Sequence, residues 1–153
     1  SRSMARIKYN NRREYLDFYS EAMVRKMGKR IRSMDGDALI PVPVHPSRLR
    51  ERGFNQAEEL ARRLSVPLGI PVNTSVLKRE RKTAPQKNLD SSGRLKNLEQ
   101  AFTAAALPSA MQKVILVDDI YTTGSTIEAC ARVLRKAGAE HVYFVTIFIG
   151  HGQ

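Results

Sequence analysis

One stretch of the sequence constrains the fold more than any other: "KVILVDD" at residues 113–119, which continues as "IYTTGST" to residue 126. Its run of four apolar residues is typical of a strand buried on both faces, as in parallel sheets covered by helices. The periodic segment from about 125 to 137 predicts a helix, and Gly138 suits the position just after it. Strand, polar loop and helix in this order indicate an α/β fold with a mainly parallel sheet flanked by helices.

Other segments fit the same fold class. Helices are predicted at 10–31 and 54–65, where apolar residues recur with helical spacing. Short strands are predicted at 38–44, 72–77 and 101–104, and a last strand at 141–149. The segment 45–53 and most of 78–96 are predicted to be loops. The spacing in the first helix favours core positions for Tyr15, Phe18 and Tyr19 over a role in a binding site.

The composition indicates one globular domain. The chain has 153 residues, of which 42% are hydrophobic and 27% charged, enough for a substantial core. We recognise neither a signal peptide nor an apolar run near the roughly 20 residues that span a bilayer, so a cytoplasmic protein without membrane insertion is expected. Ser1, Arg2 and Ser3 ahead of Met4 resemble the remnant of an expression tag, and the domain is expected to cover 4–153.

The single cysteine, Cys130, cannot form an internal disulfide, which suits a reducing cytoplasm. It shares a helical face with Ile127, Ala131 and Leu134. A packed core thiol is therefore predicted rather than a nucleophile.

The charge balance favours anionic partners. The chain has 26 Lys and Arg against 15 Asp and Glu, a formal net charge of +11. Phosphates, nucleic acid and an acidic membrane surface would all be attracted, and the charge does not choose among them. The segment 78–96 holds seven basic and two acidic residues, a local excess of +5.

The polar residues after the apolar run predict a binding site. Ligands of open α/β sheets bind beyond the carboxyl ends of the strands, which is where Asp118 and Asp119 fall. Adjacent side chains leave a strand on opposite sides, and carboxylates suit both vicinal sugar hydroxyls and Mg²⁺. The hydroxyls and backbone amides that open the next helix suit a phosphate; they belong to Thr122, Thr123, Gly124, Ser125 and Thr126. Together the two sets predict a site for a ribose 5-phosphate.

Two other classes of protein with similar local sequence patterns are excluded. A receiver domain carries its acid pair after the first strand and needs a further Asp on a later strand, but no Asp follows Asp119 here. A Walker-type phosphate loop needs a Gly-Lys-Ser/Thr core, which is absent.

The motif "VILVDDIYTTGST" resembles the binding motif for 5-phosphoribosyl 1-pyrophosphate (PRPP) in type I phosphoribosyltransferases. "PVPVHPSRLRERGFNQAEELARRL", "KRERKTAPQKNL" and "RLKNLEQAF" precede it in the order found in the ComF family, which is associated with competence and DNA uptake. The resemblance covers about residues 38–148, and "RGFNQ" and "VDDIYTTGST" are its specific elements. It implies a small N-terminal hood at about 4–36 and a core at about 38–150.

The resemblance also implies roles for individual residues. Asp118 and Asp119 would hold the ribose hydroxyls directly or through Mg²⁺, the expected cofactor, and 122–126 would wrap the 5′-phosphate. A pyrophosphate loop would include His45, Arg48 and Arg52, with Arg50 beside them. A mobile loop that closes over the site would include Arg79, Arg81, Lys82, Thr83 and Gln86.

The sequence departs from the family pattern in two respects. ComF proteins commonly carry a four-cysteine zinc module, which one cysteine cannot build, so no zinc is predicted; either the module was trimmed away or this is a short variant. In the 6-oxopurine enzymes of this fold, an acid three residues after the adjacent acid pair is the general base. Thr122 stands there instead, which argues against hypoxanthine or guanine as the acceptor.

Three functions remain open at this point. The first is a Mg²⁺-dependent transfer of phosphoribose from PRPP to an unidentified nitrogen acceptor, with release of pyrophosphate. The second is a catalytically silent PRPP sensor that binds single-stranded DNA and works with DNA-uptake proteins, and the third is a scaffold without a ligand. The intact acid pair argues against the third. The lack of an aromatic residue in 78–96 argues against strong stacking on single-stranded DNA there.

Overall fold

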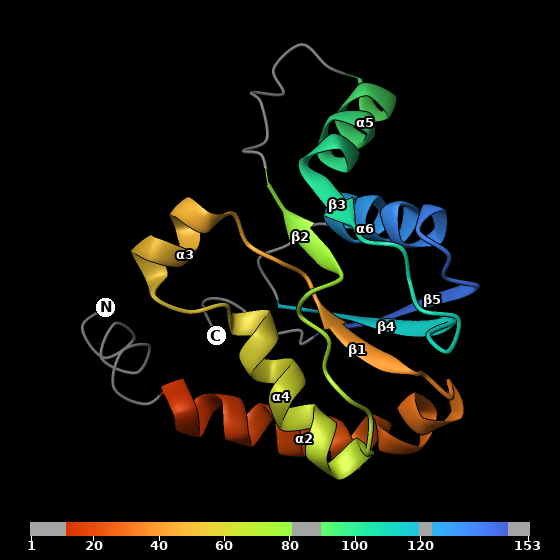
Figure 1. Cartoon of the computed structure of the whole chain (residues 1–153). Helices are drawn as coiled ribbons and strands as arrows, with labels where there is room; N and C mark the ends of the chain where they lie inside the picture. Colours follow the sequence, from red (N-terminus) through yellow and green to blue (C-terminus); the bar gives the residue numbers. More distant parts are fainter. Residues whose placement is uncertain (1–11, 81–89, 120–123, 147–153) are drawn as a thin grey trace.

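The protein has the predicted α/β fold, built around a three-stranded parallel sheet (Figure 1). The computed structural model describes residues 12–80, 90–119 and 124–146. The sheet has the order β1-β4-β5, and its strands are β1 (Ala38–Pro41), β4 (Lys113–Asp118) and β5 (His141–Thr146). The apolar run therefore forms the central strand. Ala38 lies opposite Val114 and Lys113 opposite His141, which aligns the carboxyl ends of the three strands.

The two faces of β4 pack into two separate hydrophobic clusters. Ile115 and Val117 face α2 (Arg12–Ser33) and α4 (Gln56–Leu68), and Val114 and Leu116 face the opposite side with α6 (Gly124–Lys136). All four side chains are 0% exposed. A strand covered on both faces explains the continuous apolar run in the sequence.

A second, two-stranded antiparallel sheet packs with α5 (Ser91–Ala101) and α6. Its strands are β2 (Leu77–Arg79) and β3 (Phe102–Ala104). The strand predicted at 101–104 is thus confirmed, whereas the strand predicted at 72–77 is wrong. Within 72–76 only Val72 makes a bridge, to Leu39, and regular pairing begins at Leu77.

Two predicted loops contain helices. The segment 45–53 forms α3 (Pro46–Arg52), which begins after the cap residue His45 and ends at Gly53, where φ is 79°. The segment 78–96 begins with the end of β2 and ends within α5, and its part 81–89 lies outside the described residues. The last strand is confirmed as far as Thr146, and 147–149 also lie outside the described residues.

Helix α2 packs along the sheet with α4, and this partly corrects the predicted core. Met23 and Ile31 are buried there. Phe18 is 60% exposed, so its predicted core position is wrong, while Tyr15 and Tyr19 are partly buried. The ring of Tyr19 lies 4.8 Å from that of Tyr15 and 5.2 Å from that of Phe18, so an aromatic cluster lies near the helix start. None of the helices in the described ranges has the length and apolar character needed to cross a bilayer.

Candidate functional site

Asp118 is the last residue of β4, at the carboxyl edge of the sheet. Side-chain alternation along the strand places it on the same side as Val114 and Leu116, which is the side covered by α6. The residue is 2% exposed. Its Oδ1 accepts a hydrogen bond of 2.8 Å from the backbone N–H of Asp119, and its Oδ2 has no hydrogen-bond partner among the described residues. The carboxyl group is therefore buried, and only one of its two oxygens has a hydrogen-bond partner among the described residues.

Burial strongly changes the acidity of Asp118. Loss of solvent raises the pKa of Asp118 to about 7, since a buried carboxylate loses the hydration that stabilises its charge. The hydrogen bond from Asp119 N–H opposes this change, and the charge of Asp119 adds to it. A carboxyl group in this state would be stabilised in its charged form by a cation or a hydroxyl donor at Oδ2.

The acid pair is chemically suited to Mg²⁺. The ion prefers carboxylate oxygens and retains several water molecules, so one or two carboxylates suffice to hold it. Asp118 offers the unsatisfied Oδ2, and Asp119 follows it as a half-buried residue. The donor set therefore fits the predicted cofactor.

Of the residues predicted to bind the 5′-phosphate, 122–126, the structure describes 124–126. Gly124 and Ser125 are exposed at the first turn of α6, and Thr126 is 7% exposed. A Cβ built on Gly124 would meet no described atom within 4 Å, so open space adjoins the backbone at the helix start. Thr122 and Thr123 lie outside the described residues.

Helix α3 lies beyond the carboxyl ends of β1 and β4 (Figure 1) and carries the predicted pyrophosphate residues. His45 caps this helix, because its Nδ1 accepts from Ser47 N–H at 3.0 Å. The neutral ring therefore carries its proton on Nε2, which leaves that nitrogen as a donor. Arg48 is exposed on the helix, and Arg52 is its last residue, with a side chain outside the description.

Arg79 belongs to a strand, although the sequence assigned it to the mobile loop. It ends β2 opposite Phe102, and its guanidinium carbon lies 5.3 Å from the centre of that ring. Partial burial lowers the pKa of Arg79, and the nearby positive charge of Arg48 lowers it further. The fold thus places Arg79 within electrostatic range of Arg48, which belongs to a different element. The other predicted loop residues, Arg81, Lys82, Thr83 and Gln86, lie outside the described residues.

The buried thiol of Cys130 lies within electrostatic range of both Asp118 and Arg79. It is 0% exposed in α6, as predicted for a core thiol. Burial raises the pKa of the Cys130 thiol, the charge of Asp118 raises it further, and the charge of Arg79 lowers it. Asp118 and Arg79 therefore both lie within electrostatic range of one buried atom, on the same side of the sheet.

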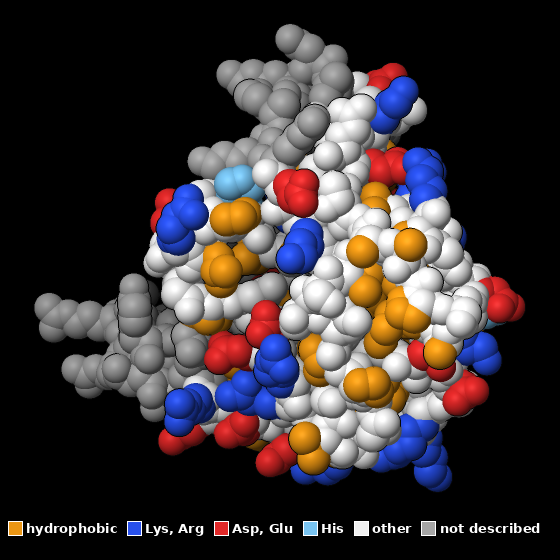
Figure 2. Space-filling model, in the orientation of Figure 1, with side chains coloured by type: hydrophobic (Ala, Val, Ile, Leu, Met, Phe, Trp, Pro, Cys, Tyr) orange, Lys and Arg blue, Asp and Glu red, His pale blue; other side chains and the backbone are white. Residues whose placement is uncertain are grey.

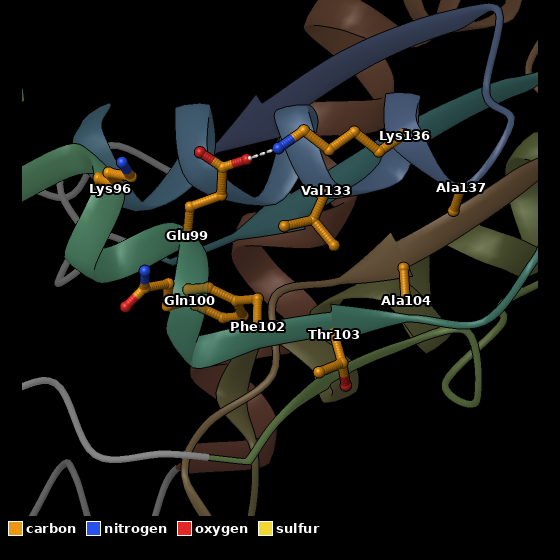
Figure 3. A pocket seen from close by; sticks show the side chains of 9 residues that line it. All are labelled: Lys96, Glu99, Gln100, Phe102, Thr103, Ala104, Val133, Lys136 and Ala137. Carbon is orange, nitrogen blue, oxygen red and sulfur yellow. Dashed lines mark hydrogen bonds and ion pairs between the residues drawn. The ribbon is translucent and has the colours of Figure 1, made fainter.

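A separate pocket of about 500 Å³ lies at the other end of α6 (Figure 3). Its floor is apolar, and Lys136 pairs with Glu99 at its edge. It is lined by Lys96, Glu99, Gln100, Phe102, Thr103, Ala104, Val133, Lys136 and Ala137. None of the predicted site residues is among them, so this pocket is distinct from the candidate site.

Sequence reasoning missed α3 and the side-chain role of Asn55. A signal for the helix was present, since Pro46 suits the first helical position and Gly53 suits the residue after the last. A signal for Asn55 was present as well, because asparagine just before a helix is a strong cap.

Comparisons with known proteins show which family the chain belongs to. A family model described as "Phosphoribosyl transferase domain" matches residues 49–153. Competence protein F of Haemophilus influenzae is 40% identical over 108 residues, which are 69% of this chain and 47% of that protein. DNA utilization protein YhgH of Escherichia coli K12 is 37% identical over 106 residues, 69% of this chain and 46% of that protein. Competence protein ComFC of Streptococcus pneumoniae is 36% identical over 103 residues, 67% of this chain and 44% of that protein.

The chain therefore belongs to the phosphoribosyl transferase domain family, and its fold is the type I phosphoribosyltransferase fold that the motifs predicted. Within that family its relatives place it among the ComF proteins. The chain spans slightly less than half the length of the relatives it matches.

Proposed function

We propose that the protein binds PRPP at the carboxyl end of β4 and transfers the 5-phosphoribosyl group to a nitrogen acceptor, with release of pyrophosphate. The observation that carries the proposal is Asp118, a buried carboxyl group at the end of the central strand with one oxygen unsatisfied among the described residues. A buried polar atom without a partner costs free energy. A ligand that supplies a hydroxyl donor or a cation would complete its contacts.

In this proposal Asp118 and Asp119 would hold the ribose 2′- and 3′-hydroxyls directly or through Mg²⁺. Bound Mg²⁺ would neutralise negative charge on the pyrophosphate group. Asp118 fixes one edge of the ribose because the strand and α6 leave its side chain little freedom. Asp119, half-buried and next in the chain, would contact the ligand from the solvent side.

The start of α6 would bind the 5′-phosphate. Backbone amides at the first turn of a helix have no partner within the helix, and the helix dipole favours an anion there. The open space beside Gly124 would let a phosphate approach these amides closely. Ser125 would add a hydroxyl, and we assign Thr122, Thr123 and Thr126 to the same role from the sequence motif.

Arg48 and Arg79 would stabilise the leaving group. As the acceptor nitrogen forms its bond to C1′, the C1′–oxygen bond breaks and its electron pair leaves with the pyrophosphate, while the nitrogen gives its proton to solvent. Positively charged groups that lie ready at this position stabilise the developing negative charge. The electrostatic effect of Arg48 on Arg79 supports this role. His45 and Arg52, together with Arg81, Lys82, Thr83 and Gln86, are assigned to pyrophosphate binding and loop closure by family resemblance.

The acceptor is proposed to be a nitrogen nucleophile other than hypoxanthine or guanine, since Thr122 replaces the acid that those bases require. We also propose that the activity serves DNA uptake, because relatives bear the names competence protein and DNA utilization protein. The part of the face in Figure 2 that the structure describes mixes Lys and Arg with acidic side chains.

Calorimetric titration tests the proposal. PRPP is titrated into the protein with and without Mg²⁺, and ribose 5-phosphate is titrated in parallel. Arg48→Ala should weaken PRPP binding about tenfold or more and leave ribose 5-phosphate unchanged. Arg62→Ala, which removes an arginine paired with Glu58 on α4, should change neither affinity. A folded protein that binds no PRPP would refute the proposal.

Turnover needs a second assay. Pyrophosphate release is followed with a panel of nitrogen bases and amines in the presence of Mg²⁺. Release that depends on one acceptor class identifies the reaction. PRPP binding without release in any combination would contradict the transfer step and favour a PRPP sensor.

A further inference from the structure

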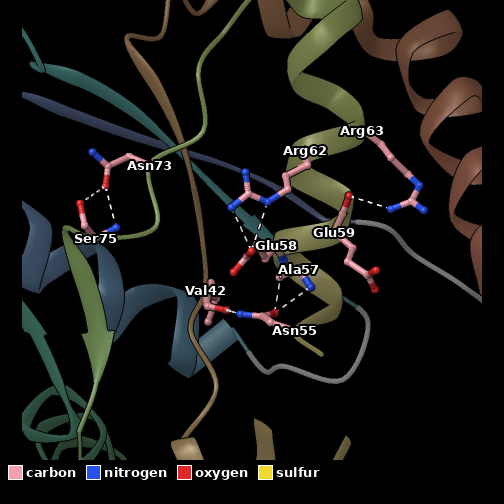
Figure 4. Close-up of polar contacts among 9 residues, drawn as sticks. All are labelled: Val42, Asn55, Ala57, Glu58, Glu59, Arg62, Arg63, Asn73 and Ser75. Carbon is pink, nitrogen blue, oxygen red and sulfur yellow. Dashed lines mark hydrogen bonds and ion pairs between the residues drawn. The ribbon is translucent and has the colours of Figure 1, made fainter. Parts of the chain in front are cut away.

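The specific motif "RGFNQ" at 52–56 contains a residue that the proposed function has not used. Gly53 follows α3 in the left-handed conformation, and Asn55 is the cap residue just before α4. The side chain of Asn55 contacts more than its own helix, as Figure 4 shows.

Asn55 uses both ends of its amide. Its Oδ1 caps α4 by accepting from the N–H groups of Ala57 at 2.9 Å and Glu58 at 3.3 Å. Its Nδ2 donates to the carbonyl oxygen of Val42 at 3.2 Å, 13 residues earlier in the chain. The first contact is an ordinary helix cap, whereas the second joins two separate segments.

The bond to Val42 closes the loop that carries α3. Val42 is the residue after β1, is 3% exposed, and donates its N–H to the carbonyl of Val117 at 2.9 Å. Val117 directly precedes Asp118. The chain leaves the sheet at Val42, forms α3 and returns at Asn55, so one hydrogen bond joins the two ends of this loop beside the acid pair.

We infer that Asn55 is a positioning residue, whose amide clamps the base of the α3 loop and so holds His45 and Arg48 at the pyrophosphate position. This inference rests on the proposed function for its effect on ligands. The clamp itself is a property of the chain and needs no ligand.

The substitutions separate the clamp from the cap. Asn55→Asp and Asn55→Ser both keep an oxygen that can cap α4, and both remove the amide Nδ2 that donates to Val42; the serine hydroxyl lies on a shorter side chain. The serine variant is neutral, so it controls for the added charge. Asn73→Asp is the matched control, because Asn73 accepts hydrogen bonds from Ser75 and Val76 through its Oδ1 (Figure 4 shows those from Ser75). The substitution therefore adds the same charge without removing a clamp.

Hydrogen–deuterium exchange tests the clamp without any ligand. Peptides that cover 43–54 should exchange faster in both Asn55 variants, while peptides from β4 should not change. Asn73→Asp should exchange like the wild type in both regions. Unchanged exchange of 43–54 in the serine variant would overturn the clamp, even if the wild type binds no PRPP.

Affinities test the consequence. Loss of the clamp should weaken PRPP binding about tenfold, the effect of one hydrogen bond of about 1.4 kcal/mol, and leave ribose 5-phosphate unchanged. A purely structural role would weaken both ligands together, and that result would overturn the inference. An effect confined to the aspartate variant would assign the loss to charge and would likewise overturn it. A wild-type protein that binds no PRPP would contradict the proposed function, while the exchange experiment would still decide on the clamp.

Discussion

Replacing Asp118 with asparagine should change how the stability of the protein depends on pH. The carboxyl group is 2% exposed, and burial raises its pKa from 3.8 to about 7. Between these two values the folded protein binds a proton that the unfolded chain does not. Stability from this group is therefore greatest at low pH and is lost as the pH rises through 7.

The size of the effect follows from the shift. Each pKa unit corresponds to about 1.4 kcal/mol, so the protonated carboxyl contributes about 4 kcal/mol at low pH. Between pH 5 and pH 8 the wild type should lose about 2 to 3 kcal/mol of its unfolding free energy through this group. Asparagine does not ionise in this range, so the variant should lack this loss.

Urea unfolding at pH 5, 6, 7 and 8 measures the effect. The comparison uses the difference in slope between the wild type and Asp118→Asn, because asparagine also changes the contacts at the site. Asp35→Asn is the matched control, since this carboxylate is 88% exposed and its φ of 53° suits asparagine. The pKa of Asp37, in contrast, is lowered, because its carboxylate accepts hydrogen bonds from the backbone N–H groups of Lys113 and Gln112, so it does not contribute to the slope between pH 5 and pH 8.

The effect of Mg²⁺ on the unfolding free energy provides a second test. Ions that bind ionised Asp118 should raise the stability of the wild type more at pH 8 than at pH 5, and should have little effect on Asp118→Asn. A wild-type slope no steeper than that of the asparagine variant would refute the reasoning about burial. An equal Mg²⁺ effect on both proteins would place the ion elsewhere.

Other predictions test the core and the surface. Leu64 is a fully buried residue of α4 in the cluster that this helix forms with α2, so Leu64→Ala should lower the unfolding free energy by about 2–5 kcal/mol in a urea titration. Val66 on the same helix is 85% exposed, so Val66→Ala should change the unfolding free energy by less than about 0.5 kcal/mol. Gly53→Ala should cost about 1–2 kcal/mol, because φ is 79° and a Cβ would meet no described atom, so only backbone strain changes; an unchanged midpoint would count against that conformation. Cys130 should react with a thiol reagent only on unfolding, and fast labelling of the native protein would contradict its burial. Any affinity for single-stranded DNA should fall steeply with added salt in a fluorescence titration, and binding insensitive to salt would exclude a phosphate-tracking mode.

The central strand and its acid pair were predictable because two signals agreed. An apolar run of this length needs burial on both faces, and the acids mark the point where the chain leaves the core. Alternation along the strand then placed Asp118 and Asp119 on different sides. At this strand the local sequence pattern and the packing in the fold both indicate a buried strand that ends at the acid pair.

Helix α3 was missed because it has no apolar periodicity. Arginine and glutamate make up most of its seven residues, and only its ends, Pro46 and Gly53, carry helix signals. Strand β2 was misplaced because its pairing with β3 depends on residues more than 20 positions away. The clamp at Asn55 was invisible for the same reason, since its partner Val42 is set by the fold.

Phe18 shows a different limit. Periodicity identified α2 as amphipathic, but the buried stripe runs through Leu16, Met23 and Ile31, and Phe18 falls beside it. Which of several apolar residues faces inward depends on the packing against α4. The sequence of α2 alone does not show which of its residues contact α4.

The order of strands in the sheet has a consequence for how the chain folds during synthesis. β4 lies between β1 and β5, so within the described three-stranded sheet β1 pairs with no other strand until β4 has left the ribosome; before that it has the single bridge from Leu39 to Val72. Until then the cluster that β1, α2 and α4 form lacks Ile115 and Val117 of β4. A nascent chain that ends before β4 should therefore remain unfolded and depend on chaperones, whereas extension past β5 should produce protease resistance in one step.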